Sequence, residues 1–371
     1  MSEELPGHDR GRRFPVGSIT KGGKGMRRTL AVSLGTAVAF AAFMPAGQAS
    51  TGARIHVVKP GHSIQKAVNK ARHGDVIQLK AGRYDGGVLV RKPLTIRGAG
   101  NRTVLRPGRK DYCAKVRQPG MGICVVGRAG HPVRNVTVKK LSVQYFKETG
   151  VLGLHTDRLT VEHVLAKKNG EYGIAEFNST RGRFVHNWVQ HSGEHAGLYV
   201  GDVANAHGTV VAENHASGNA MGLLIRHARN VKVYGNTFVG NCAGVLLVDD
   251  GRPGGQGHNA LWKNKISKNN RNCRPYGPVP ALKGTGILLF GGDHNSIKKN
   301  EVTYNRGRLP YSGGIVLFRG VPPQNRPARH NVVEANRVLG NAPYDLVDRS
   351  GSRTNKFRAN HCRTSKPRGL C

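Results

Sequence analysis

The sequence is poor in acidic side chains: 21 Asp and Glu residues stand against 58 Lys and Arg residues, giving a formal net charge of +37. Such a charge predicts acidic partners, namely a polyanionic polysaccharide, an anionic cell envelope or nucleic acid. The basic residues are spread along the whole chain instead of being gathered into one patch interleaved with aromatic residues. We therefore expect general affinity for polyanions and no specific nucleic-acid site.

The chain after residue 49 also lacks several signatures of function. It has no apolar run long enough to span a membrane, no phosphate-binding nucleotide loop, no nucleophile elbow and no metalloprotease helix. It contains no Cys-x-x-Cys pair, which disfavours a zinc site. These absences argue against nucleotide-dependent enzymes, α/β-hydrolases and zinc proteases.

The one long apolar run lies near the amino terminus. Arg27 and Arg28 precede apolar residues 30–43, and small residues at 46–49 offer a cleavage site before Ser50. The run is too short to cross a bilayer but typical of a signal peptide. We interpret residues 1–49 as an amino-terminal extension plus a secretory signal that is removed. Residues 50–371 are then a single secreted domain, which we expect to be a monomer.

All six cysteines lie in the exported part, and an even count outside the cell predicts disulfides. Six cysteines allow fifteen pairings. Our hypothesis is pairing between nearest neighbours, which gives Cys113–Cys124, Cys242–Cys273 and Cys362–Cys371.

Asparagine recurs at steps of five residues, each time in a similar setting. Asn331, Asn336 and Asn341 keep this step, and so do two upstream triplets that begin at Asn259 and Asn295. A glycine followed by an apolar strand comes after most copies. Short repeats of this kind are typical of a solenoid of stacked coils. We expect each Asn to occupy a tight bend, where it tolerates left-handed backbone and stacks its amide on that of the next coil.

An amphipathic helix is predicted before the repeats. Ile64, Ala67, Val68 and Ala71 keep helical spacing, with Ser63 as N-cap and Gly74 as the stop. Such a helix would cap the first open coil of the solenoid.

The stretch from Ser63 through Gly74-Asp75 and Gly82-x-Tyr84, followed by Asn/Gly coils, resembles the start of right-handed parallel β-helix proteins of the pectin-lyase-like superfamily. The segment around Cys242 looks like those of secreted actinobacterial β-helix repeat proteins of undefined activity. The resemblance implies an all-β fold, a single-stranded right-handed parallel β-helix with an amino-terminal capping helix. It does not imply one activity, because the superfamily contains lyases, hydrolases, epimerases and adhesins. Of the catalytic signatures of its enzyme families, only the Asp249-Asp250 pair is present.

Alternation along the glycine-led strands predicts which side chains face outward. Counted from each glycine, positions one and three should point inward, although Glu176 at position three warns of a register shift near that coil. The outward rows are unexpectedly apolar, which indicates a binding surface, a cover formed by the insertions or by a partner chain, or a wrong phase assignment. They comprise Leu152, Ala175, Tyr199, Leu224, Leu246, Leu288 and Val316, and Leu154, Phe177, Gly201, Arg226, Val248, Phe290 and Phe318. Insertions at 270–283 and 306–312 and an excursion at 249–257 should wall a groove over these rows.

The best candidate for chemistry is the end of three successive glycine-led strands. Coils about 4.8 Å apart would bring Asp202, Arg226, His227, Asp249 and Asp250 within reach of one another. We predict these five as catalytic residues; the alternative is a polar ladder that closes the strands. We predict Tyr199, Phe290, Phe318 and Arg319 as substrate-binding residues, and Asp202, Asp249 and Asp250 as ligands of Ca²⁺, the one cofactor we consider.

Two mechanisms suit such residues. In β-elimination or epimerisation of a uronic-acid polymer, a cation neutralises the substrate carboxylate, and Arg226, His227 or a nearby Lys removes the C5 proton. In hydrolysis, paired carboxylates act as acid and base. The predicted function is action on an acidic polysaccharide, most plausibly as a lyase or epimerase. The alternative is a non-catalytic solenoid that binds anionic glycan or cell envelope, and whether the protein is an enzyme at all stays open at this point.

Overall fold

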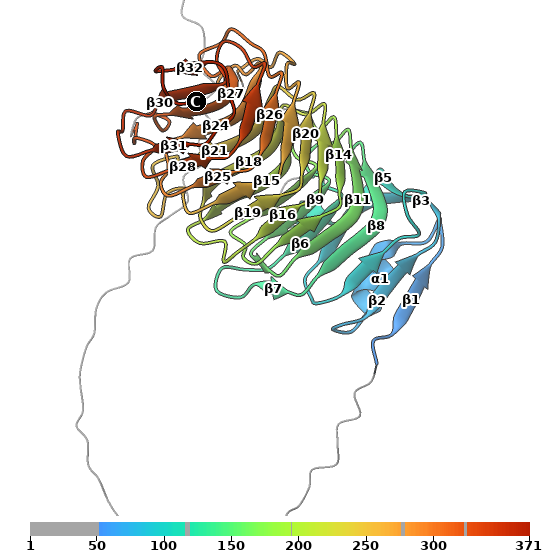
Figure 1. Ribbon diagram of the computed structural model, residues 1–371. Coiled ribbons are helices and arrows are strands. Elements are labelled where there is room, and N and C mark those ends of the chain that lie inside the picture. Colours follow the sequence, from blue (N-terminus) through green and yellow to red (C-terminus); the bar gives the residue numbers. More distant parts are fainter. Residues whose placement is uncertain (1–51, 116–118, 194, 276–278, 323–324) are drawn as a thin grey trace, which may run out of the picture. The chain divides into compact units, whose positions relative to one another are not determined.

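The computed structural model describes residues 52–115, 119–193, 195–275, 279–322 and 325–371. The predicted signal segment, 1–49, lies outside the described residues. In the described part, parallel strands stack along one axis, from the blue to the red end of Figure 1. The fold is therefore all-β, a parallel β-helix, as predicted. No helix in these residues is long and apolar enough to cross a membrane.

The first coils are irregular in length. They comprise β1 (Ile55–Val58), α1 (Ile64–Lys70), β2 (Val76–Leu79), β3 (Gly82–Val90), β4 (Thr95–Arg97), β5 (Thr103–Asp111), the 3₁₀ turn η1 (Cys113–Lys115), β6 (Ile123–Val126), β7 (Val133–Arg134), β8 (Thr137–Gln144), β9 (Val151–Leu154), β10 (Thr156–Asp157), β11 (Thr160–Lys167) and β12 (Ile174–Phe177).

From residue 183 to residue 349 each coil contributes three strands, which stack into three columns, and the last coil adds strands to columns one and three. Column one contains β13 (Arg183–Val185), β16 (Val210–Ala212), β19 (Lys232–Tyr234), β22 (Ala260–Trp262), β25 (Ser296–Lys298), β28 (Val332–Glu334) and β31 (Lys356–Arg358). Column two contains β14 (Trp188–Gln190), β17 (His215–Ser217), β20 (Thr237–Val239), β23 (Lys265–Ser267), β26 (Glu301–Thr303) and β29 (Arg337–Leu339). Column three continues β6, β9 and β12 with β15 (Ala196–Val203), β18 (Met221–Ala228), β21 (Ala243–Val248), β24 (Thr285–Phe290), β27 (Gly313–Phe318), β30 (Leu346–Arg349) and β32 (Ser365–Lys366).

Helix α1 begins where the sequence places it. The Ser63 side chain accepts a hydrogen bond from the Lys66 backbone N–H at 3.3 Å, and Ile64 and Val68 are buried in the core. Gln65 is also buried, and its amide bonds both backbone groups of Leu89 in β3. The helix thus joins the first coils through both apolar and polar contacts. Its role as a cap of the solenoid stays a prediction.

The inward rows of the glycine-led strands form the main core, as alternation predicts. Both inward positions of column three are buried there in successive coils, and columns one and two contribute their central residues, among them Phe184, Phe238, Ile266 and Val302. Period-two alternation therefore assigned the inner face correctly.

One carboxyl group lies inside this core. Glu176 of β12 is fully buried; its Oε1 accepts a hydrogen bond from Thr209 Oγ1 at 3.0 Å, and its Oε2 has no hydrogen-bond partner within the described residues. It pairs in register with Gly153 and Val200. The strand is therefore not shifted, and the register slip suspected from the sequence is wrong. Burial raises the pKa of Glu176 to about 7, because no cation offsets its charge.

The recurrent asparagines form hydrogen-bonded ladders. Oδ1 of Asn264 accepts from the backbone N–H and Nδ2 of Asn236 in the preceding coil, at 3.0 and 2.9 Å. The corresponding groups of Asn264 donate to Oδ1 of Asn300 in the next coil at 3.1 and 2.9 Å, and Nδ2 also donates to the Val233 carbonyl. The predicted amide stacking is confirmed. Each amide satisfies backbone groups at a corner, where no strand partner is available.

The backbone role predicted for these asparagines is wrong. None of the repeat asparagines has a positive φ; the residue before each one does, with φ of 52° at His258, 55° at Lys263 and 53° at Lys268. The Asn side chain must point inward to reach its neighbours, so the preceding residue makes the left-handed turn. In other coils Gly235 and Gly240 occupy this position, where a positive φ carries no steric penalty.

The outward apolar rows of column three are not open to solvent. Most of their apolar side chains are buried in a second apolar cluster, and Leu154, Val248 and Phe318 are partly buried against it. The insertions contribute Cys273, Val279, Leu282 and Tyr311 to this cluster. The predicted insertions do lie side by side, since Ser312 Oγ donates to the Lys283 carbonyl. In the coils from β21 to β27 the insertions therefore cover these rows, which was one of the interpretations considered.

The three disulfides join nearest neighbours, as hypothesised: Cys113–Cys124, Cys242–Cys273 and Cys362–Cys371. The second ties the insertion at 270–283 to the start of β21.

Replacing Asn264 by Ala should lower the free energy of unfolding by about 3 kcal/mol. The buried Nδ2 donor of Asn236 then loses its acceptor, and the Val233 carbonyl and Asn300 Oδ1 lose a donor. Urea denaturation measures the change. Asn272→Ala, an exposed position outside the ladders, is the control and should change stability by less than about 0.5 kcal/mol. Equal effects of the two substitutions would contradict the ladder's structural role.

Glu176 predicts a specific pH dependence of stability. Because its folded pKa is raised from 4.5 to about 7, its neutral form stabilises the fold fully below pH 4.5. That contribution is lost as pH rises toward 7, amounting to roughly 3 kcal/mol. In Glu176→Gln the loss should be absent, so the variant should be more stable than the parent at pH 8 and similar at pH 4.5. Thermal unfolding across this range tests it; parallel curves would refute the assignment.

Candidate functional site

Four of the five predicted catalytic residues meet where β15, β18 and β21 end. Asp202 lies in β15, Arg226 and His227 lie in β18, and Asp250 follows β21. The register pairs Gly201 with Arg226 and Arg226 with Val248, so the side chains come from three successive coils. Convergence at this strand end follows directly from the stacking of the coils.

The meeting side chains form a network of ion pairs. Arg226 Nη2 lies 3.1 Å from Asp202 Oδ1, and Arg226 Nε lies 3.8 Å from Asp250 Oδ2. His227 Nδ1 is 3.0 Å from Asp250 Oδ1. Arg252 joins both carboxylates, with its Nε 2.6 Å from Asp250 and its Nη2 in contact with Asp202. We call Asp202, Arg226, His227, Asp250 and Arg252 the charged cluster.

Burial sharpens the electrostatics of the charged cluster. Burial opposes ionisation of Asp250, yet the hydrogen bond with His227 and the nearby Arg252 guanidinium hold the pKa of Asp250 well below its usual range. Burial also opposes the charge of Arg226, but Tyr199, Asp202 and Asp250 keep the pKa of Arg226 above its usual value. Asp250 and Arg226 are therefore both ionised at neutral pH. Since the ionised Asp250 is an acceptor only, His227 Nδ1 is the donor of this hydrogen bond; in the neutral imidazole the lone pair is then on Nε2.

Aromatic side chains adjoin the charged cluster. Tyr199 packs between Phe177 and Tyr172, with ring centroids 4.5 and 4.9 Å away. Its hydroxyl is buried without a hydrogen-bond partner within the described residues, and so is Arg226 Nε. Burial raises the pKa of Tyr199, so this hydroxyl stays protonated. A side chain at Gly201 would clash with the hydroxyl, so Gly201 makes room for Tyr199.

Asp249, the fifth predicted catalytic residue, faces away from the charged cluster. Its Oδ1 accepts a hydrogen bond from the Gly251 N–H at 2.9 Å, and it lines a separate pocket of about 440 Å³. Arg229, Asp293, Arg326 and Arg329 are among the other residues that line this pocket. Successive residues of an extended chain point in opposite directions, which separates Asp249 from Asp250.

The other predicted substrate-binding residues lie farther along the solenoid. Phe290 is 4% exposed and Phe318 is partly buried, and Tyr311 packs edge-on against both rings. Arg319 is exposed, and its guanidinium lies against Gly351. Of the four predicted residues, only Tyr199 adjoins the charged cluster.

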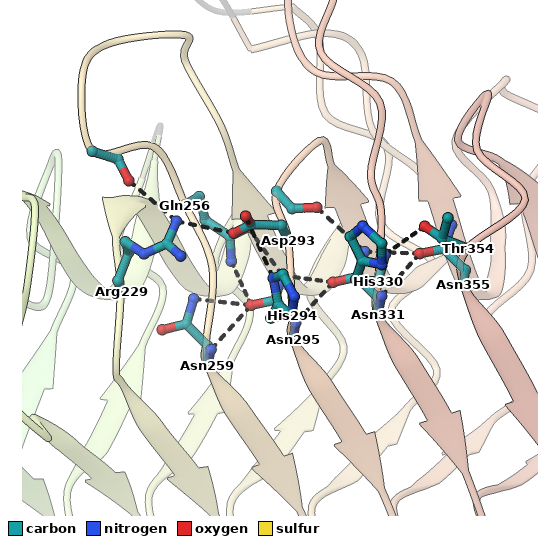
Figure 2. A network of polar contacts seen from close by, with 12 residues as sticks. Arg229, Gln256, Asn259, Asp293, His294, Asn295, His330, Asn331, Thr354 and Asn355 are labelled. Atoms are coloured by element: carbon teal, nitrogen blue, oxygen red, sulfur yellow. Dashed lines mark hydrogen bonds and ion pairs between the residues drawn. The ribbon is translucent and has the colours of Figure 1, made fainter.

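The carboxylates predicted to bind Ca²⁺ do not form a ligand group: Asp202 and Asp250 contact arginines and Asp249 points elsewhere. Among the described residues, the one group of three side chains with metal-ligand atoms within 4.8 Å is His258, Asp293 and His294. Figure 2 shows Asp293 bound to Arg229, and His294 stacked near His330 at the turn before the asparagine ladder. The ring centroids of His258 and His294 are 4.9 Å apart with parallel planes. His258 and His294 each come directly before an asparagine of the repeat, Asn259 or Asn295, so they occupy the same position in successive coils.

Sequence reasoning missed Arg252 and Tyr172. Arg252 lies two residues after Asp250 in the excursion. Because residues two apart in an extended chain point to the same side, this spacing could have indicated that Arg252 joins Asp250. Nothing in the sequence near Tyr172 indicates its contact with Tyr199, because that contact joins two coils.

Comparison with known proteins agrees with the architecture. A family model described as "Right handed beta helix region" matches residues 114–253. No curated protein matches the chain. Among solved structures, the mannuronan C-5 epimerase AlgE6 A-module of Azotobacter vinelandii is 19% identical, with a TM-score of 0.60 over 80% of this chain and 88% of that one. DFA-IIIase from Arthrobacter chlorophenolicus A6 is 14% identical, with a TM-score of 0.56 over 77% and 83% of the two chains. The periplasmic alginate epimerase AlgG is 12% identical, with a TM-score of 0.56 over 84% and 76%.

Proposed function

We propose that this parallel β-helix protein, part of which matches a right-handed β-helix family model, acts outside the cell on an acidic, uronic-acid-type polysaccharide. The reaction is a lyase-type or epimerase-type one that begins with removal of the C5 proton. The observation that carries this proposal is the His227–Asp250 pair held beside two arginines. Two similar structures, a mannuronan C-5 epimerase module and a periplasmic alginate epimerase, support the substrate class.

His227 is the proposed general base. The ionised Asp250 accepts a hydrogen bond from His227 Nδ1–H, with 3.0 Å between the nitrogen and Oδ1. This bond favours the tautomer in which Nε2 is the basic nitrogen. His227 is 7% exposed, so the imidazole is held firmly by its surroundings. Of the three bases considered from the sequence, Arg226, His227 and a nearby Lys, the arginine is disfavoured: the pKa of Arg226 is raised, and a guanidinium cannot accept a proton at neutral pH.

Arg226 and Arg252 are proposed to bind the substrate carboxylate. Removal of the C5 proton places negative charge on that carboxylate, and a neighbouring guanidinium stabilises it more in the transition state than in the ground state. Arg252 comes from the excursion and is half exposed, which makes it the arginine better able to exchange a protein carboxylate for a substrate one.

The fate of the carbanion decides the product. Expulsion of the O4 substituent gives an unsaturated uronate and a cleaved chain, whereas return of a proton to C5 from the opposite side gives the epimer. Either outcome consumes one proton, which solvent supplies. The Tyr199 hydroxyl is fully buried, so it packs beside Arg226 and does not reach the substrate. Asp202 holds Arg226 in place and takes no part in proton transfer.

A non-catalytic function is the second candidate. The charges of the two carboxylates and the two guanidiniums in the charged cluster cancel. Such a neutral network could serve only to hold the 249–257 excursion against the ends of the strands. The protein would then bind anionic glycan or cell envelope without altering it. Binding of Ca²⁺ by Asp202 or Asp250 also stays a proposal; it requires these carboxylates to leave their arginines. The three disulfides support an extracellular location.

His227→Ala should lower the rate at least a hundredfold, because the C5 proton loses its base. The protein is incubated in D₂O with polygalacturonate, alginate and a glucuronate polymer, with Ca²⁺ or with chelator. NMR follows deuterium entering C5, ultraviolet absorbance follows unsaturated uronate, and a reducing-end assay follows hydrolysis. His294→Ala is the matched control: His294 also faces an aspartate, with its Nδ1 3.5 Å from Asp293, but lies outside the charged cluster.

Equal activity of His227→Ala and the parent would refute the assigned base. Reducing ends without absorbance or deuterium would replace the proposal by a hydrolase. Absence of all three signals with every polymer, while the polymers still bind, would leave the non-catalytic function.

A further inference from the structure

Both tryptophans of the chain lie on the outer surface of columns one and two. Trp188 of β14 is 52% exposed, and its ring stacks on His215 of β17 with centroids 4.4 Å apart. Trp262 of β22 stacks in the same way on Tyr234 of β19, at 4.6 Å. The two pairs occupy four successive coils, as the strand register requires. We call these four aromatic residues the tryptophan face.

Unpaired cations surround the tryptophan face. Lys232 precedes Tyr234 on β19, and Lys263 and Lys265 follow Trp262; all three are exposed and form no ion pair within the described residues. The next coils differ: Glu334 pairs there with both Lys298 and Arg358. Positive charge is therefore left uncompensated where the aromatic rings gather.

The two acidic residues nearest to these lysines do not neutralise them. Glu301 pairs in register with Lys265 but its carboxylate contacts Arg337 at 3.3 Å. Glu213, at the corner between columns one and two, contacts His186 at 3.1 Å. The tryptophan face is thus complementary to a polyanion, and its charge attracts one over a distance of about a Debye length.

The orientation of the rings selects among polyanions. Each ring stacks on a partner one coil away, so its planes face neighbouring coils along the solenoid axis. On the other side of each indole the register places Leu165 beside Trp188 and Lys298 beside Trp262, which leaves the ring edges to solvent. Single-stranded nucleic acids bind by stacking bases on free aromatic planes, which this arrangement does not offer to solvent. Indole N–H, imidazole and phenol groups at the exposed edges match the hydroxyl groups of a sugar, and lysines match its carboxylates or sulfates.

We propose that the tryptophan face, with Lys232, Lys263 and Lys265, binds a chain of anionic polysaccharide. It is a second binding site, because the charged cluster lies at the ends of column-three strands. Binding of a polymer at the tryptophan face does not depend on the reaction proposed for His227. The experiment for this binding site therefore needs no measurement of that reaction.

The two tryptophans report on this face directly, since no other indole contributes to the emission. Tryptophan fluorescence of the protein is titrated at low salt with polygalacturonate, with neutral dextran and with the single-stranded oligonucleotide poly(dT). Polygalacturonate should change the emission and dextran should not. Neutralising the three lysines (K232Q, K263Q and K265Q together) should weaken polygalacturonate binding about tenfold or more.

A charge-matched variant separates this site from general basicity. Lys66, Lys70 and Lys80 are exposed and form no ion pairs within the described residues, so K66Q, K70Q and K80Q together remove the same charge away from the tryptophan face. This variant should bind within about twofold of the parent. Equal weakening by both triple variants, an emission change with poly(dT) at least as strong as with polygalacturonate, or retention of polygalacturonate without any emission change would each overturn the proposal.

Discussion

The structure depends on one interaction, the hydrogen bond from the backbone and amide of one asparagine to the Oδ1 of the asparagine in the next coil. Strand pairing alone leaves the corners of a coil without partners, and a buried corner without partners would be costly. The ladder removes that cost and fixes the register of successive coils. Every side chain outside it, including those of the charged cluster, is positioned by this repeat.

Because the coils are in register, side chains far apart in sequence become neighbours. Asp202, Arg226 and Asp250 are about one coil apart in the chain but share ion pairs at the strand ends. The same register brings Trp188 against His215 and Tyr234 against Trp262 on another side. One stacking rule therefore builds two surfaces of different chemistry: a charged, partly buried cluster, and an exposed row of ring edges with free lysines.

The repeat made much of this predictable from the sequence. Five-residue asparagine steps predicted the ladder, and alternation predicted the inner face even at Glu176. The convergence of Asp202, Arg226 and His227 followed from coil spacing. Alternation was not followed past the end of the strand, so Asp249 was grouped with Asp250 and Arg252 was missed. The spread of basic residues along the chain also hid their gathering around Trp188 and Trp262, because neighbours on this face are 20 to 30 residues apart in sequence.

The central claim is that the two arginines of the charged cluster receive a sugar carboxylate. The most direct measurement follows the side-chain Nε–H resonances of arginine by NMR while a short uronate oligosaccharide is added. The account predicts that the signals of Arg226, whose Nε has no hydrogen-bond partner within the described residues, and of Arg252 shift with saturation. Those of Arg337 and Arg358, paired with glutamates on another side, should stay unchanged. Saturable binding that leaves Arg226 and Arg252 unmoved would contradict it.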